Sequence, residues 1–86
     1  MSLRDDIEER LRIEFAPEDL EVGDDSRHHI GHAGAKGGGH YTVLIVAEGF
    51  RGHSLLDRHR LVYDALAPLR QNIHALSIRA LAPGEI

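Results

Sequence analysis

The sequence of 86 residues contains no cysteine. This absence excludes a disulfide framework, a thiol nucleophile and a thiolate metal site built by this chain alone. Any chemistry that needs a soft metal or an iron–sulfur cluster would therefore take its sulfur from a partner. No apolar run approaches the ~18 residues of a membrane helix, and the acidic segment over residues 1–10 lacks the apolar stretch of a secretory signal. These absences predict a cytoplasmic protein with no membrane partner.

Positive charge and aromatic side chains are also scarce. The formal net charge is -4, and the chain has two tyrosines and two phenylalanines, so the basic surface that dominates nucleic-acid binding is absent overall. Residues 1–25 carry ten acidic and three basic side chains, whereas residues 26–86 carry four acidic and seven basic. Such asymmetry indicates either an electrostatic face for a partner or a solvated acidic helix.

Histidine, in contrast, is abundant. It is the commonest metal ligand among protein side chains and titrates near neutrality, so seven in one small domain need an explanation. A terminal tag is not the explanation, because none is terminal and no run of six occurs. The seven are His28, His29, His32, His40, His53, His59 and His74. Four of them lie in or beside residues 25–39, a stretch with five glycines. A loop this long is more often functional or mobile than idle.

The hydrophobic pattern predicts a single domain. Apolar residues four apart indicate a first helix that opens with a capping box at Ser2. Alternating or β-branched runs predict the strands. In order, we expect a helix over residues 2–15, strands over 20–22 and 40–47, a helix over 54–69 with a break near Asp57, and a strand over 73–81. A wide hairpin makes the first two strands antiparallel, and a right-handed crossover makes the last two parallel. The expected fold is therefore an α+β domain with a three-stranded mixed sheet and its helices on one face.

Three segments resemble the BolA family in order and spacing. Phe-Arg-Gly at residues 50–52, followed by Arg-His-Arg-Leu-Val at 58–62, resembles the signature F-x-G then RHR-x-V. The segment 73–78 resembles a final strand that opens with His-Ala, and residues 20–26 resemble the family's first segment. The resemblance covers about residues 4–83. It implies an α-β-β-α-α-β domain similar to the type II KH fold, but without the G-x-x-G loop that clamps nucleotides in KH domains.

The resemblance also implies a function. Members of the family partner monothiol glutaredoxins, and the pair holds a [2Fe-2S] cluster used in iron–sulfur trafficking, assembly or iron regulation. The glutaredoxin and its bound glutathione would supply sulfur and this chain would supply imidazole, so no cofactor is expected in the isolated chain. Replacing thiolates by imidazole raises the potential of such a cluster and makes its release pH-sensitive. One branch of the family is instead treated as DNA-binding transcriptional regulators, which is the alternative function.

The family's cluster ligand from the last strand corresponds to His74. A second ligand comes from the loop between the first two strands, where alignment favours His29 and leaves His32 and His28 as alternatives. His29 and His32 could also form an adventitious metal pair. From the residues alone, His74 shares a strand face with two apolar residues, and a histidine at the edge of the core would be favoured.

Four residues form the predicted contact patch for a partner or nucleic acid: Arg51, Arg58, His59 and Arg60. They surround a helix-turn-helix-like segment and could bind phosphates. They could equally bind carboxylates of a glutaredoxin or of glutathione. For His59, a role as a capping or surface histidine is an equally favoured alternative to a partner contact.

Catalysis is not expected. Ser54, Asp57 and His59 cannot form a triad, because residues two apart on one helix do not face each other, and nothing supplies an oxyanion hole. The glycines of residues 25–39 do not fit a phosphate-binding P-loop. No long exposed apolar stripe demands a stable homodimer, so the chain is expected to be a monomer when alone.

Overall fold

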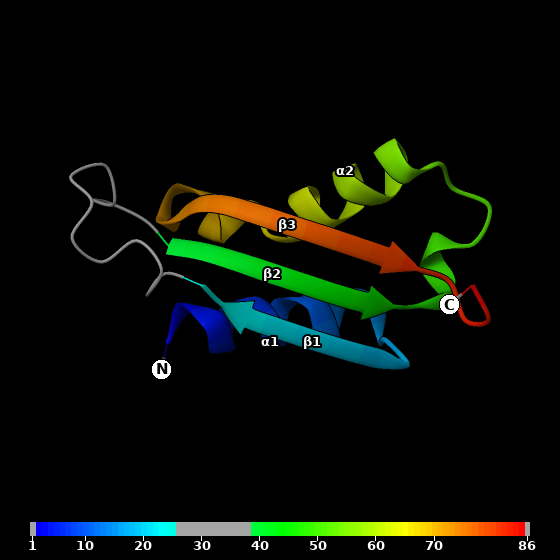
Figure 1. Ribbon diagram of the computed structural model, residues 1–86, viewed down its shortest axis with the longest axis horizontal. Helices are drawn as coiled ribbons and strands as arrows, with labels where there is room; N and C mark the ends of the chain where they lie inside the picture. Colours follow the sequence, from blue (N-terminus) through cyan, green and yellow to red (C-terminus); the bar gives the residue numbers. More distant parts are fainter. Residues whose placement is uncertain (1, 26–38, 86) are drawn as a thin grey trace.

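The computed structural model describes residues 2–25 and 39–85. Its elements are α1 (Leu3–Phe15), β1 (Asp19–Asp24), β2 (Gly39–Val46), the 3-10 turn η3 (Glu48–Phe50), α2 (Leu55–Ala65), the 3-10 helix η4 (Ala67–Asn72) and β3 (Ile73–Leu81). The strands form one sheet in the order β1-β2-β3, and α1 and α2 both lie behind it in Figure 1. The predicted α+β class and three-stranded mixed sheet are confirmed. None of the helices in the described part of the chain is long and apolar enough to span a membrane.

The first helix begins and ends close to its predicted limits. The Ser2 hydroxyl accepts a hydrogen bond from the Asp5 N–H at 3.1 Å, so one of the free donors at the helix N-terminus is satisfied. The helix ends at Phe15, and the next residue, Ala16, caps it with a left-handed backbone (φ 44°) and donates its N–H to the Arg12 carbonyl. Between these caps, Ile7 and Leu11 are fully buried and belong to the hydrophobic core between the helices and the sheet.

The second helix is shorter than predicted. It ends at Ala65, and the chain continues through the 3-10 helix η4 to Asn72. Pro68 explains the change, because it has no N–H to donate to the Asp64 carbonyl and its ring would clash there. The predicted break near Asp57 was wrong, since α2 is continuous through that residue.

Replacing Ser54 with alanine should destabilise α2 by about 1 kcal/mol. The Ser54 hydroxyl accepts from the Asp57 N–H at 3.1 Å, and alanine cannot replace that acceptor. Urea unfolding would measure the loss. Ser54→Asp is the matched control, because aspartate also caps helices and should keep most of the stability. Equal losses in the two variants would contradict a capping role.

The sheet has the predicted strand directions and one irregularity. β1 and β2 are antiparallel, and β2 and β3 are parallel. On β3, Ile73 pairs with Gly39 and Ala75 pairs with His40, so His74 is an extra residue without a partner on β2. A bulge of this kind bends the strand and redirects a side chain. The prediction that His74 shares the face of the apolar residues was therefore wrong, and His74 is exposed.

The F-x-G segment connects the sheet to α2 through the core. Phe50 is fully buried, and its ring lies 4.9 Å from that of Phe15, centroid to centroid. Gly52 has φ +82°, a conformation that strains residues with a side chain. These two residues direct the chain out of the core and into the start of α2.

Candidate functional site

His74 lies at the start of β3 with its ring beside that of His40 on β2. The two ring centroids are 4.9 Å apart and the ring planes differ by 36°. His40 is half-buried, whereas His74 is exposed. His74 forms no hydrogen bond or ion pair with any residue in 2–25 or 39–85. The bulge thus presents an imidazole whose nitrogens can bind a group outside this part of the chain.

A small polar hollow adjoins His74 on the side of the helices. It has a volume of about 110 Å³ and is lined by Tyr63, Arg70 and residues 73–76. The Arg70 guanidinium lies over the Tyr63 ring at 4.9 Å from its centroid, which is within the range of a cation–π contact. A cation therefore lies beside the exposed histidine.

The sequence interpretation missed His40 and Arg70 as neighbours of His74. The proximity of His40 could have been found, because a parallel pairing of 40–47 with 73–81 places the starts of these strands together. The position of Arg70 could not, since it depends on where α2 gives way to η4.

The predicted loop ligand lies outside the described residues, as do its two alternatives (His29, His32 and His28). The choice among them stays a prediction. Within residues 2–25 and 39–85, no three histidine, aspartate or glutamate side chains gather at a common point.

Arg58 has a structural role that the sequence interpretation did not predict. Its side chain is 9% exposed, and its guanidinium binds both oxygens of Glu85, at 2.6 and 3.0 Å. It also donates to the His53 carbonyl at 2.9 Å and to the Ala80 carbonyl at 3.0 Å. The contact role predicted for Arg58 stays a prediction, and the structure disfavours it because the side chain is buried and its guanidinium binds groups inside the molecule.

The other members of the predicted contact patch remain at the surface. Arg51 is exposed, but it pairs with Glu48 and donates to the Pro83 carbonyl at 2.9 Å. Arg60 is exposed and forms no ion pair within the described residues, and His59 is half-buried. The patch thus retains one arginine without a partner in the described part of the chain.

Stability should fall with acid between about pH 4.5 and 2 because of Glu85. The hydrogen bond from Arg58, followed by the Ala82 N–H, lowers the pKa of Glu85 from 4.5 to about 2. A carboxyl whose pKa is lower in the folded state stabilises the fold above its unfolded pKa, and this contribution is lost as pH falls toward the folded pKa. Thermal unfolding measured from pH 6 to pH 2 should show a steeper loss in the wild type than in Glu85→Gln.

The matched control for this pH dependence is Glu9→Gln. Glu9 is exposed and forms no ion pair within the described residues. Its removal should leave the slope of stability against pH as in the wild type. A Glu85→Gln slope equal to that of the wild type would contradict the assignment.

Comparisons with known proteins match this architecture. The family model described as BolA-like protein matches residues 11–85. The chain is 44% identical to SufE-like protein 1, chloroplastic/mitochondrial, of Arabidopsis thaliana over 93% of its length, and 42% identical to the DNA-binding transcriptional regulator BolA of Escherichia coli over 91%. It covers 73% of the Escherichia coli protein but 24% of the Arabidopsis protein. It also covers 52% of another Arabidopsis relative, chloroplastic BOLA1.

A solved structure has the same fold. The BolA domain of SufE1 from Arabidopsis thaliana superposes with a TM-score of 0.85 at 44% identity, over 100% of this chain and 98% of that domain. The Escherichia coli relative is named a DNA-binding transcriptional regulator, another Arabidopsis relative is named BOLA1, and the description of the matching family, BolA-like protein, names no enzyme. The chain therefore belongs to the BolA-like protein family.

Proposed function

We propose that this protein partners a monothiol glutaredoxin and holds with it a shared [2Fe-2S] cluster, in iron–sulfur trafficking, assembly or iron regulation. The observation that carries the proposal is His74, an exposed imidazole on a β-bulge with no hydrogen bond to the described residues. Because the chain has no cysteine, the thiolates of such a cluster must come from the partner and its glutathione. The donor set of this chain fits the remaining role, since imidazole replaces thiolate at one iron in Rieske-type centres.

The residues around His74 suit this role in two ways. His40 places its ring beside the His74 ring from the neighbouring strand, 4.9 Å away between centroids. Neighbours that orient a metal-binding histidine affect metal affinity, most often through a hydrogen bond to its second ring nitrogen, and we infer that the ring contact with His40 helps to orient His74. Arg70 lies beside His74 at the small hollow and is placed to bind a carboxylate of the partner or of glutathione. A second imidazole would come from the loop, with His29 preferred over His32 and His28.

Co-purification with a monothiol glutaredoxin tests the proposal. The complex should show visible absorption and circular dichroism distinct from those of the glutaredoxin alone. Size-exclusion chromatography should place both proteins and the colour in one peak. Separate elution, with all the colour on the glutaredoxin, would contradict the proposal.

Replacing His40 with alanine should weaken the complex without abolishing its cluster spectrum. The variant removes the ring that orients His74 but leaves the ligand itself, so cluster retention should fall by roughly tenfold. His40→Phe keeps a ring at the same place and should restore cluster retention toward that of the wild type. An equal fall in cluster retention in both variants would show that the ring contact is not the function of His40.

The second candidate function is DNA binding, which the name of the Escherichia coli relative favours. Arg60 is the arginine of the predicted patch that remains available, whereas Arg58 is buried and Arg51 is paired. Salt-titrated binding to duplex DNA would test this function. Tight, sequence-dependent binding that Arg60→Glu abolishes would favour it.

A further inference from the structure

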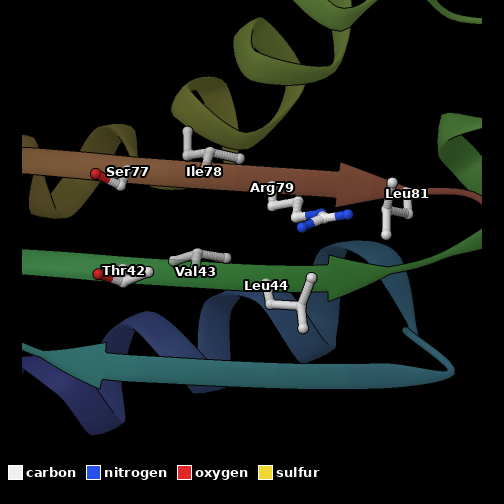
Figure 2. Close-up of a pocket in the computed structure, with 7 residues that line it drawn as sticks. All are labelled: Thr42, Val43, Leu44, Ser77, Ile78, Arg79 and Leu81. Atoms are coloured by element: carbon white, nitrogen blue, oxygen red, sulfur yellow. The ribbon is translucent and has the colours of Figure 1, made fainter. Parts of the chain in front are cut away.

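The sheet face opposite the helices carries both charges and an apolar centre. By strand register, the accessible side chains on this open face include Asp19, Glu21, His40, Thr42, Leu44, Ser77, Arg79 and Leu81, whereas Val46 shares the register but is buried. Figure 2 shows Leu44, Arg79 and Leu81 toward the carboxyl ends of β2 and β3, with the helices behind the strands. They line a shallow hollow of about 370 Å³. The open face is thus an apolar surface with a charged border.

One row across this face has opposite charges at its two ends. Glu21 on β1 pairs with Leu44 on β2, and Leu44 pairs with Arg79 on β3. From one sheet edge to the other, the row therefore consists of an acidic, an apolar and a basic side chain. Glu21 and Arg79 are both exposed, and neither forms an ion pair within the described residues. Both charges are available for an external partner.

This row is complementary to a second copy of itself. A two-fold axis parallel to β2, lying between two open faces, keeps the position along the strands and exchanges the two sheet edges. Glu21 of each copy then lies opposite Arg79 of the other, and Leu44 lies opposite Leu44. Two sheets packed face to face lie about 10 Å apart with their strands within about 30°. Side chains as long as arginine and glutamate can meet across that distance.

We propose that the open face is the interface of a weak, two-fold symmetric homodimer. A single surface that matches itself under a two-fold axis is the usual form of a dimer interface. The face is only three strands wide, and stable complexes bury roughly 800 Å² per partner. We therefore expect a dissociation constant on the order of 100 µM. The chain stays a monomer at low concentration, in agreement with the expectation from sequence.

The dimer is independent of the proposed cluster function. His74 is the second residue of β3, and Leu81 is its last. The apolar part of the open face thus lies at the opposite end of β3 from the histidine. His74→Ala should leave the self-association unchanged, so failure of one proposal does not imply failure of the other.

Charge reversal tests the interface. Sedimentation velocity from about 10 µM to about 1 mM should show a monomer–dimer equilibrium for the wild type. Arg79→Glu or Glu21→Arg alone places like charges opposite each other twice and should weaken the dimer by about tenfold or more. The double variant, Glu21→Arg with Arg79→Glu, restores opposite charges and should restore the dimer.

Two matched controls separate the interface from general charge effects. Arg60→Glu changes the net charge as Arg79→Glu does, and Glu9→Arg changes it as Glu21→Arg does, but both positions are on helices behind the sheet. Each should dimerise as the wild type does. A wild type that stays monomeric at about 1 mM would overturn the proposal. So would single reversals without effect, or a double variant that remains as weak as the singles while circular dichroism shows it folded.

Discussion

Replacing His74 with alanine should abolish the cluster spectrum of the mixed complex with a monothiol glutaredoxin and leave the fold intact. The ring is exposed and has one ring contact in the described part of the chain, that with His40. Its loss should therefore change the stability by no more than about 0.5 kcal/mol, as is usual for surface substitutions. Loss of a metal ligand has a larger effect than loss of a supporting neighbour, so cluster retention should fall by well over tenfold.

Visible circular dichroism of the mixed complex, at equal concentrations of both proteins, measures this loss. His53→Ala is the matched control, because His53 is an exposed histidine in the turn before α2 and not at the start of β3. It should leave the spectrum unchanged. An unchanged spectrum in His74→Ala would show that the ligand assignment is wrong, even if the two proteins still form a complex.

The position of the His74 ring shows where sequence interpretation reaches its limit. The limits of β3 and its parallel pairing with β2 follow from a run of apolar and β-branched residues and from the crossover rule. The bulge at His74 does not follow from them, because it depends on how two strands distant in sequence meet in space. A one-residue shift reverses which side chains face the core. From the residues alone, His74 is therefore expected at the edge of the core, whereas the structure leaves it exposed.

Other elements show the same division between local and distant causes. Both helix N-termini could be predicted because a serine caps a donor three residues away. The early end of α2 could also have been predicted, since Pro68 removes a donor. The burial of Arg58 could not, because its partner Glu85 is 27 residues away and beyond the last predicted strand. Helix caps and breaks could thus be predicted from neighbouring residues, whereas contacts between distant residues could be predicted only where strand pairing implies them, as for His40 and His74.

Replacing Arg58 with alanine should lower the melting temperature by roughly 10–20 °C. The guanidinium joins three parts of the chain: the turn before α2 through the His53 carbonyl, β3 through the Ala80 carbonyl, and the C-terminal segment through Glu85. Alanine would leave these acceptors without their donor in a largely buried place, and unpaired buried groups are costly. Differential scanning calorimetry measures the effect. Arg58→Lys should recover little, because an ammonium cannot replace the two-pronged contact with a carboxylate.

The matched control is Arg60→Ala, two residues along the same helix. Arg60 is exposed and forms no ion pair within the described residues. The melting temperature of the Arg60→Ala variant should therefore differ from that of the wild type by no more than about 3 °C. The contrast also determines how DNA binding must be tested. Loss of binding in Arg58→Ala would reflect loss of the fold, whereas loss in Arg60→Ala would reflect a missing contact. If Arg58→Ala instead melted at the same temperature as the wild type, the structural role of Arg58 would be contradicted, and Arg58 would again be a candidate contact residue.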